Sequence, residues 1–400
     1  MTRGRQAVAL LLLAAFGVAL SLLVLEAGVR ALHLVPTRFW EPDALLGTRL
    51  IAGKEGWWTQ EDHEFAVSIR INSQRRRDVE RDAAKPAGVF RILVLGDSFI
   101  EALQVPLEET FSRRLEADLE AVMGKGAVQV SSMGVSGYGT PSQTLYYEQA
   151  GRELDPDLVL LAFYPGNDVR NSSPTLEPLL RPVYGDDGAL ERVVTLGRDN
   201  ATAEANRGIL WNLQAYQYAR KILLTKQPRL AGLLADVGLL KQEAVREAAT
   251  DGGVPVDYGV YDANLSAEWE DAWRHTTRLL ARLELDVESD GARLAVMIVT
   301  ARDHICPKAW ARVLEANPAM REREWDLEAP ELRVVRWCKE HAIPCIRLSP
   351  VFAEQAEQGE SLHFMYDGHW NPKGHALAAR TVAASLEQAG LLGTKLTEER

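Results

Sequence analysis

A serine that follows a strongly apolar segment is the first residue in the chain suited to covalent chemistry. Residues 90–96 read FRILVLG, and Asp97 and Ser98 then begin a helical pattern. If residues 90–96 form a parallel strand, Ser98 lies at the edge where open α/β sheets bind ligands. Backbone N–H groups of the following turn favour an anion there, such as a tetrahedral oxyanion. Ser98 is therefore a candidate nucleophile, and helix capping is its alternative role.

A carboxylate and an imidazole near the C-terminus are a candidate partner for that serine. Residues 363–377 read HFMYDGHWNPKGHAL, so Asp367 and His369 are two positions apart. In an extended segment such residues point the same way, which would let Asp367 orient the imidazole. Histidine has an unperturbed pKa suited to general base catalysis near neutrality. The alternatives are a polar surface pair or a pair of metal ligands.

Two further strand ends offer hydrogen-bond donors for an oxyanion. Residues 131–143 read SSMGVSGYGTPSQ, a loop in which Gly137 and its neighbouring glycines allow close backbone approach to a ligand. Residues 163–171 read FYPGNDVRN, where the side chain of Asn167 offers an N–H group. Ordinary turns explain each stretch when it is taken alone. Together with Ser98, they predict an oxyanion hole formed by the N–H groups of Ser98 and Gly137 and the Asn167 amide.

Several other residues are weaker candidates. Arg302 and His304 follow an expected strand at the same sheet edge, and we treat them as substrate-binding candidates. Trp370 is a third such candidate, for stacking on a sugar, with packing in the core as its alternative. Among the three cysteines, Cys306 is expected at the opposite end of the sheet from the other two. Any disulfide should therefore join Cys338 and Cys345, and a free, buried Cys345 is the alternative.

Strands and helices alternate over most of the chain. Five short apolar segments without polar alternation are typical of parallel strands covered on both faces. The amphipathic segments between and after them predict helices, so the chain should form a doubly wound α/β sheet with right-handed crossovers. The predicted strands are 90–96, 127–133, 157–163, 293–300 and 343–349, and the predicted helices are 107–123, 141–153, 265–290, 328–341 and 372–389.

The spacing of these elements also predicts the domain organisation. The catalytic domain should span residues 89–390, interrupted by an insertion at 171–264 that contains weak helices near 209–224 and 229–249. Residues 27–88 are expected to form a stalk with one weak strand, FAVSIRINS, and residues 391–400 a tail. Insertions near the strand ends usually shape the ligand site.

The N-terminus predicts a membrane anchor. Residues 7–25 read AVALLLLAAFGVALSLLVL and contain no charged side chain. At about 1.5 Å per residue this run nearly covers a bilayer core of about 30 Å. We expect a cytoplasmic tail at 1–5 that includes Arg3 and Arg5, a transmembrane helix at 6–26, and an extracytoplasmic remainder. A cleaved signal peptide is the alternative, although its apolar region is usually only about 7–15 residues long.

Composition restricts the possible partners. The net charge of -11 argues against nucleic-acid binding, which usually requires a basic surface. No pair or cluster of cysteines and histidines has the spacing of a zinc site. The membrane is an expected partner, and no metal or organic cofactor is implied. An ester or acetylated carbohydrate substrate is what the resemblance of the candidate residues to a known family implies.

The four stretches together resemble the signature blocks of the SGNH (GDSL-like) hydrolases. Gly96-Asp97-Ser98 matches the nucleophile block, GVSGYG the glycine block with Gly137, PGND the block of Asn167, and DGHWN the block of Asp367 and His369. The resemblance covers about residues 88–390 apart from the insertion. It implies a flavodoxin-like three-layer α/β/α sandwich with a five-stranded parallel sheet, and a Ser-His-Asp triad.

Two positions depart from the usual family pattern. Pro165 replaces the glycine of the Gly-x-Asn-Asp block, and Tyr366 stands where the aspartate three residues before the histidine is usual. The Asp-x-His-Trp form is similar to the alginate O-acetylation proteins AlgJ and AlgX. INSQRRRDVE, at residues 71–80, is similar to bacterial membrane-anchored members of the superfamily.

The sequence therefore predicts a membrane-anchored extracytoplasmic serine esterase. One alternative is an O-acetyltransferase that acts on a cell-envelope or secreted polysaccharide. A second alternative is a non-catalytic carbohydrate-binding or assembly protein that kept the fold.

Overall fold

The structure is a computed structural model that describes residues 3–60, 64–177, 181–185, 189–194, 213–227, 230, 250–251 and 254–393. The chain divides into two compact units. The smaller unit comprises residues 1–37, 59–66 and 198–248, and the larger unit comprises the rest. All candidate site residues belong to the larger unit.

A five-stranded parallel sheet forms the centre of the larger unit. The strand order is β13-β12-β7-β5-β6, which is the 2-1-3-4-5 order of flavodoxin-like sheets. Each of the five predicted strands is found with its ends within two residues, and the predicted fold class is confirmed. The strands are β5 (Phe90–Gly96), β6 (Val128–Gly134), β7 (Leu158–Phe163), β12 (Arg293–Ile298) and β13 (Cys345–Arg347).

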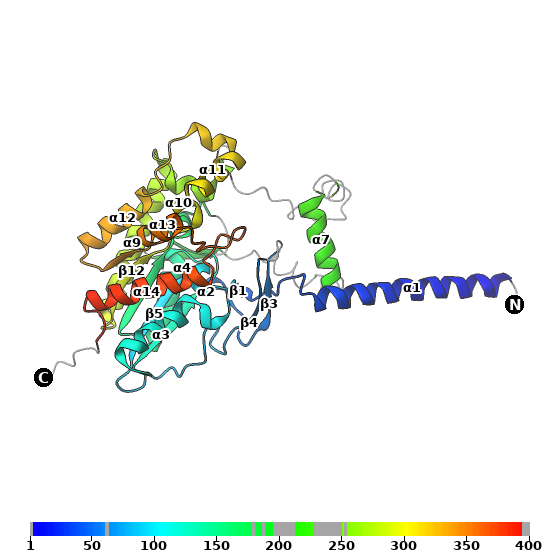
Figure 1. Ribbon diagram of the computed structural model, residues 1–400, viewed down its shortest axis with the longest axis horizontal. Coiled ribbons are helices and arrows are strands. Elements are labelled where there is room, and N and C mark those ends of the chain that lie inside the picture. Colours follow the sequence, from blue (N-terminus) through cyan, green and yellow to red (C-terminus); the bar gives the residue numbers. More distant parts are fainter. Residues whose placement is uncertain are drawn as a thin grey trace. The chain divides into compact units, whose positions relative to one another are not determined.

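Helices cover both faces of this sheet (Figure 1). The core on one face joins Ile92 and Val94 of β5 to α3 (Phe111–Met123), α13 (Ser349–Glu357) and α14 (Pro372–Gln388). On the other face Phe163 of β7 stacks on Trp273 of α9 at 6.4 Å between ring centroids. The helices that pack on that side are α4 (Thr140–Tyr146), α9 (Ala267–Ser289) and α12 (Ala329–Glu340). Each helix that the amphipathic pattern predicted is thus present.

Short helices follow the strands at the edge that carries the candidate residues. These are α2 (Ser98–Glu101), α5 (Pro165–Arg170), α10 (Arg302–Ile305) and α11 (Pro307–Ala316). Single turns of 3-10 or π helix complete the connections. They are η1 (Leu107–Glu109), η2 (Tyr147–Gly151), η3 (Arg152–Leu154), η6 (Val256–Tyr261) and η7 (Pro318–Glu322).

Much of the segment expected to be a stalk packs as part of the larger unit. Residues 38–58 and 67–88 belong to that unit, in which they form β1 (Trp40–Asp43), β2 (Gly47–Leu50), β3 (Glu55–Thr59) and β4 (Ala66–Arg70). Strands β1 and β2 pair antiparallel, and β4 is the strand expected from FAVSIRINS.

The insertion contains strands as well as helices. Its described part includes an antiparallel pair, β8 (Arg181–Tyr184) and β9 (Leu190–Val194), and a second short pair, β10 (Thr250–Asp251) and β11 (Val254–Pro255). The expectation of a helical insertion is corrected accordingly. The predicted weak helix at 209–224 overlaps α7 (Gln214–Lys226), and the one at 229–249 lies outside the described residues except for residue 230.

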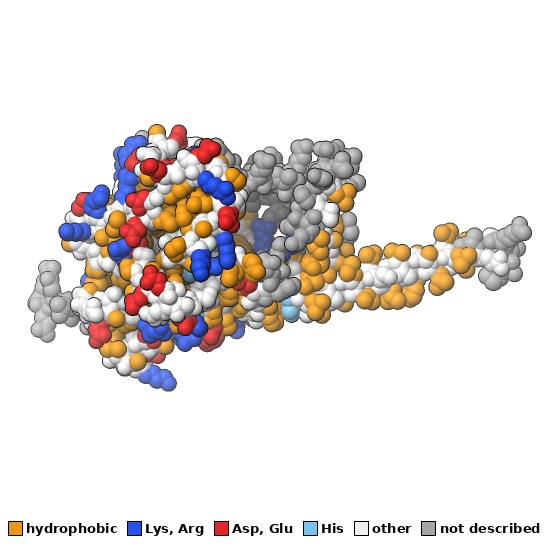
Figure 2. Space-filling model, turned by 45° about the horizontal axis from the view of Figure 1, so that its top comes forward, with side chains coloured by type: hydrophobic (Ala, Val, Ile, Leu, Met, Phe, Trp, Pro, Cys, Tyr) orange, Lys and Arg blue, Asp and Glu red, His pale blue; other side chains and the backbone are white. Residues whose placement is uncertain are grey.

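The smaller unit contains the apolar N-terminal helix α1 (Arg3–Ala31). Residues 4–31 have a mean hydropathy of 2.9 over their most apolar window, which suffices by length and composition to cross a membrane. Apolar side chains gather along this helix (Figure 2). Helix α7 packs against α1, and the carboxylate of Glu26 accepts hydrogen bonds from the backbone N–H groups of Gln214 and Ala215.

All three cysteines are free thiols. Cys338 is buried on α12, and Cys345 lies half-buried at the start of β13, as the predicted helix and strand require. The disulfide expected between them if any pair formed is absent. The two thiols are close enough to interact, because a hydrogen bond with Cys345 raises the pKa of Cys338, as does burial.

Candidate active site

Ser98, His369 and Asp367 form a continuous chain of hydrogen bonds. The Oγ atom of Ser98 lies 2.7 Å from Nε2 of His369, and Nδ1 of His369 lies 2.7 Å from Oδ1 of Asp367. The backbone N–H of His369 also donates to Oδ1 of Asp367 at 3.2 Å. With its proton on Nδ1, the imidazole donates to Asp367 and accepts from the Ser98 hydroxyl. This is the order of groups that activates a serine for nucleophilic attack.

The position of Ser98 follows from the turn between β5 and α2. Asp97 caps α2, and its carboxylate accepts from the N–H of Phe99 at 2.9 Å. The backbone of this helix lies directly against β6, where a Cβ atom on Gly134 would be only 2.3 Å from the nitrogen of Glu101. Glycine at 134 therefore allows the turn to sit against the sheet edge, which accounts for one glycine of the predicted glycine-rich loop.

A short closed loop, residues 363–371, holds the histidine; we call it the terminal loop. His363 and Trp370 form an antiparallel bridge, and the N–H of Phe364 donates to the carbonyl of His369 at 2.9 Å. The turn passes through Gly368 at φ +84°, a conformation that favours glycine. The Phe99 ring lies 4.7 Å from the imidazole of His369, between ring centroids. These contacts fix the position of the base next to the nucleophile.

Asn167 is brought to the same place by α5. Its Nδ2 atom donates to Oδ2 of Asp97 at 2.6 Å. An amide nitrogen carries two hydrogens, so this bond still leaves one N–H of Asn167 for a ligand. Burial raises the pKa of Asp97 to about 6, against the hydrogen bonds from Phe99 and Asn167 and the charge of His369, which lower it. Asp97 thus orients the Asn167 amide as well as capping α2.

A cavity of about 310 Å³ opens above these residues. Of the predicted oxyanion donors, Ser98 and Asn167 line this cavity, whereas Gly137 does not. Gly137 is exposed, with φ +79°, and its carbonyl accepts from Nδ2 of Asn171 at 2.7 Å. The structure thus brings together four of the five predicted catalytic and oxyanion residues.

The three weaker candidates differ in their positions. His304 lines the cavity, and its Nδ1 atom lies 3.4 Å from the hydroxyl of Tyr261. Arg302 is not among the lining residues, and its Nη1 atom donates to the carbonyl of Met365 at 2.9 Å. Trp370 has no exposed surface and donates to the carbonyl of Thr300 at 3.0 Å. Substrate stacking on Trp370 is therefore corrected to core packing.

The cavity is also lined by several residues that the sequence motifs did not indicate. Tyr164 follows β7 directly, and Asp303 lies beside His304, so their position after predicted strands was an available signal. Asp257 and Tyr258 come from the insertion, where no strand pattern indicates which residues return to the sheet edge. Among the described residues, no group of three or more His, Cys, Asp or Glu side chains is arranged to hold a metal ion.

An arginine-rich segment, residues 75–81, contacts the backbone at the end of α2, the helix that begins with Ser98. Arg77 is 3% exposed, and its guanidinium donates to the carbonyls of Glu101, Ala102 and Val105. These carbonyls lie at the end of α2 and beyond it, where a helix leaves acceptors without partners. Burial lowers the pKa of Arg77 to about 10, so it remains charged at neutral pH.

The same segment also protects the edge of the sheet. The carboxylate of Asp78 accepts from the N–H of Ser132 at 3.0 Å, and Arg81 donates to the carbonyl of Val130 at 3.1 Å. Both partners belong to β6, the outer strand of the sheet. Unpaired strand edges otherwise remain open to pairing with other chains.

Comparison with known proteins gives one family match. Residues 262–399 match the family model described as "SGNH hydrolase-like domain, acetyltransferase AlgX". The matched part includes the terminal loop but not Ser98 or Asn167. It confirms the predicted resemblance to the SGNH superfamily and to its alginate-acetylation members. No curated protein matches the chain.

Solved structures that resemble this chain do so at low identity. A catalytic mutant of an acetylxylan esterase from Geobacillus stearothermophilus is 12% identical with a TM-score of 0.39, covering 76% of this chain and 96% of that one. A GDSL-like lipase from Bacteroides thetaiotaomicron is 11% identical with a TM-score of 0.33, covering 75% and 88%. The acetyl xylan esterase AlAXEase is 10% identical with a TM-score of 0.35, covering 74% and 100%. The match of residues 262–399 to the family model supports an enzyme that acts on ester bonds, either a hydrolase or an acetyltransferase.

Proposed function

We propose that this protein is a serine esterase in which Ser98 is the nucleophile, His369 the general base and Asp367 the residue that orients His369. The observation that supports this most strongly is the unbroken chain of two 2.7 Å hydrogen bonds from Ser98 to Asp367. A serine hydroxyl is a weak nucleophile until a neighbouring base can accept its proton.

The reaction proceeds in two steps. The Oγ atom of Ser98 attacks the ester carbonyl while Nε2 of His369 takes the hydroxyl proton, and Asp367 stabilises the resulting imidazolium. The C–O bond to the alcohol then breaks, His369 returns the proton to the leaving oxygen, and an acyl-serine remains. Water attacks this ester with His369 again as the base, which releases the acid and restores Ser98.

The oxyanion of both tetrahedral intermediates needs preorganised donors. The backbone N–H of Ser98 and the second amide N–H of Asn167 are the donors that we assign, because both residues line the cavity. The bond to Asp97 holds the Asn167 amide in place. Gly137 lies outside the lining and is not assigned this role.

An O-acetyltransferase is a second candidate, which the match of residues 262–399 to the acetyltransferase AlgX family model favours. The same acyl-serine would form, and a sugar hydroxyl would replace water as its acceptor. Product analysis separates the two functions, because hydrolysis releases free acetate whereas transfer gives an acetylated sugar. The non-catalytic alternative is disfavoured by the intact hydrogen-bond chain at Ser98.

The proposed function is tested by turnover of p-nitrophenyl acetate by the purified full chain in detergent. Ser98→Ala should abolish turnover above background, while Ser289→Ala, an exposed serine at the end of α9, should leave it unchanged. Equal activity of the wild type and Ser98→Ala would reject the serine mechanism. An inactive wild type, together with no acyl transfer to a glycan acceptor, would favour the non-catalytic alternative.

We further propose that α1 anchors the enzyme in a membrane, with its catalytic unit on the extracytoplasmic side. The length and hydropathy of α1 support the anchor, and Arg3 and Arg5 support a cytoplasmic N-terminus. Protease is added to cells whose outer envelope has been permeabilised while the cytoplasmic membrane stays closed. It should degrade the catalytic unit. N-terminal sequencing of the mature protein should recover residues before Ala7, and a start near Gly28 would show cleavage instead.

A further inference from the structure

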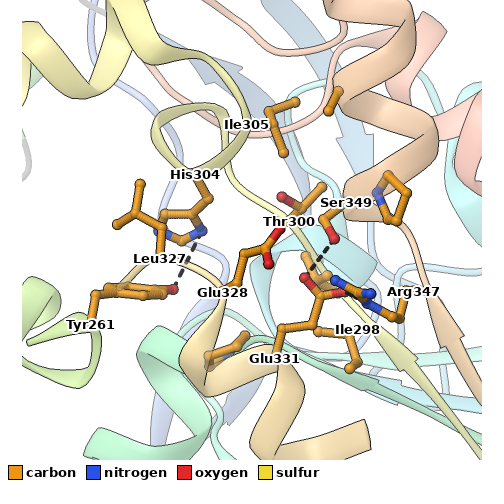
Figure 3. A pocket seen from close by; sticks show the side chains of 14 residues that line it. Tyr261, Ile298, Thr300, His304, Ile305, Leu327, Glu328, Glu331, Arg347 and Ser349 are labelled. Carbon is orange, nitrogen blue, oxygen red and sulfur yellow. Dashed lines mark hydrogen bonds and ion pairs between the residues drawn. The ribbon is translucent and has the colours of Figure 1, made fainter. Parts of the chain in front are cut away.

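A second cavity adjoins the catalytic one. It has a volume of about 250 Å³ and lies at the carboxyl ends of β12 and β13 (Figure 3). Tyr261, Leu327 and Ile305 contribute aromatic and apolar walls, and Glu328 and Arg347 contribute polar groups. A small number of polar groups on apolar walls is typical of ligand sites.

The two cavities meet at His304. This residue lines both of them, and Pro165 lines the second cavity while its neighbour Gly166 lines the first. Figure 3 shows the imidazole of His304 facing the hydroxyl of Tyr261, from which its Nδ1 atom is 3.4 Å away. His304 therefore forms part of the wall of each cavity, and a ligand that filled both would extend past its imidazole. Such a ligand is an extended molecule with at least two units.

Some polar groups of the second cavity form hydrogen bonds with one another. Glu331 accepts from Nε of Arg347 at 2.7 Å and from the hydroxyl of Ser349 at 2.5 Å. Figure 3 shows Ser349 facing the Glu331 carboxylate. The terminal nitrogens of Arg347 retain donor capacity. The Glu328 carboxylate, whose charge adds to the hydrogen bond with Glu331 in raising the pKa of Arg347, forms no hydrogen bond or ion pair among the described residues. The cavity thus presents one donor group and one acceptor group, which suits hydroxyl groups.

The combined lining is strongly acidic. Five carboxylates and a single arginine line the two cavities; the carboxylates are Asp257, Asp303, Asp367, Glu328 and Glu331, and the arginine is Arg347. Arg347 pairs with Glu331 and Arg170 pairs with Asp257, while Asp303 and Glu328 form no ion pair within the described part of the chain. Arg170 also pairs with Glu177, and Arg302 is turned toward the carbonyl of Met365.

The histidines do not supply the missing positive charge at neutral pH. Burial lowers the pKa of His304 to about 4, so this side chain is neutral. His369 faces Asp367, which balances any charge that it gains. An anionic ligand would therefore meet repulsion along both cavities, whereas the hydroxyl groups of a neutral ligand would find acceptors.

We propose that the two cavities bind an uncharged glycan chain, with the ester-bearing unit in the catalytic cavity and the adjacent sugar unit in the second cavity. This inference rests on the proposed function for the identity of the catalytic cavity. It adds the substrate class, a neutral glycan rather than a uronate polymer, and a binding site for the neighbouring sugar.

Binding to the full chain carrying Ser98→Ala tests the charge preference without turnover. A neutral xylo-oligosaccharide and an oligogalacturonate of equal length are titrated separately by calorimetry. The neutral probe should bind, and the acidic probe should bind at least about tenfold more weakly, which is about 1.4 kcal/mol. Equal or tighter binding of the acidic probe, or no binding of the neutral probe, would overturn the proposal.

Two pairs of variants then assign the second cavity. Ala353→Phe should fill it and weaken the neutral oligosaccharide about tenfold, whereas Glu357→Phe, exposed on the same helix outside the cavity, should not. Glu328→Lys should reduce the discrimination against the oligogalacturonate about fivefold to tenfold. Its control is Glu340→Lys, exposed at the far end of α12. Unchanged binding in both cavity variants would exclude the second cavity as the sugar site.

Turnover of p-nitrophenyl acetate separates this proposal from the proposed function. With Ser98 intact, the control variant Glu357→Phe, which lies outside both cavities, should retain turnover within about twofold. If the wild type binds the neutral glycan but cannot turn over any ester, the proposed function fails and the glycan site stands. If it turns over the small ester but fails to bind the glycan, the glycan site alone is wrong.

Discussion

Two segments far apart in the sequence contact the turn that carries Ser98, and their environments differ sharply. The terminal loop places His369 and Asp367 at the cavity, with side chains 24% and 17% exposed. The arginine-rich segment places Arg77 and Asp78 behind the turn, at 3% and 5% exposure. His369 and Asp367 face the cavity, whereas Arg77 and Asp78 are enclosed by protein.

The contrast separates chemistry from positioning. Groups that exchange protons with a substrate must reach the cavity, so variants of the terminal loop should lose activity while the fold remains. Groups such as Arg77 act by satisfying backbone carbonyls behind the nucleophile, so variants there should first lose stability. Each prediction below tests whether the two segments really differ in this way.

The largest effect is expected for the base. His369→Ala should lower kcat by a factor on the order of 10⁶, as loss of the serine or histidine does in other serine hydrolases. The melting temperature should change little, because the imidazole is partly exposed and contacts Ser98 at the cavity. Stopped assays of p-nitrophenyl acetate and a thermal melt on the same sample measure both. A large fall in the melting temperature would break the comparison.

Asp367→Asn should give the next largest loss. Removal of the carboxylate that fixes the tautomer of a catalytic histidine costs about 10⁴-fold in kcat. KM should change little, because Asp367 contacts Nδ1 of His369 on the side away from Ser98. If kcat falls only a few-fold, His369 works without Asp367 and the site is a dyad.

Arg77→Ala should behave in the opposite way. It removes donors from three buried carbonyls, and each buried acceptor left without a partner costs about 1–3 kcal/mol. The urea midpoint should fall strongly, and the kcat of the fraction that remains folded should fall less than in Asp367→Asn. Arg70→Ala, whose side chain is 72% exposed, is the control and should be close to neutral. A stable but inactive Arg77→Ala would assign this arginine to the chemistry.

A smaller, pH-dependent effect is expected at Glu101, which lies between the two segments. Burial raises the pKa of Glu101 to about 7, against hydrogen bonds from Ser136 and Trp40 that lower it. The folded state therefore keeps a proton that the unfolded state releases above a pKa of 4.5. Stability should fall by up to about 3 kcal/mol as the pH rises from about 4.5 to 7.

Urea unfolding of the wild type and Glu101→Gln across this pH range measures that effect. The variant should differ from the wild type in overall stability, because an amide offers Trp40 and Ser136 one acceptor oxygen where the carboxyl group offers two. Its unfolding free energy should nevertheless lose the part of the pH slope that comes from Glu101. An unchanged slope would mean that Glu101 keeps an ordinary pKa.

The terminal loop was predictable from the sequence and the role of the arginine-rich segment was not. Asp367 and His369 are recognisable because residue type and spacing alone suggest their chemistry, and the strands that position the serine are continuous apolar runs. Arg77 gives no such signal, because its function depends on burial against carbonyls more than twenty residues away. The stretch INSQRRRDVE, which contains Arg77, indicated a family resemblance. It did not indicate that Arg77 contacts the carbonyls beyond the nucleophile turn.

The remaining differences have the same cause. Trp370 lies next to a predicted catalytic residue, but the side to which its ring points depends on the bridge to His363. The second cavity is built from η6 and from the ends of β12 and β13, so no continuous stretch of sequence outlines it. Spacing along the chain therefore located the reacting groups, while long-range packing determined which neighbours face them.

The central claim is that Ser98 forms a covalent acyl intermediate, and direct mapping of that intermediate is the most decisive test. The full chain is mixed with p-nitrophenyl acetate, quenched in acid during turnover, digested and examined by mass spectrometry. We predict one added acetyl group on the peptide containing Ser98, and none on that peptide in Ser98→Ala or His369→Ala. Turnover with the acetyl group on another residue, or with no acetylated peptide at any quench time, would contradict the account.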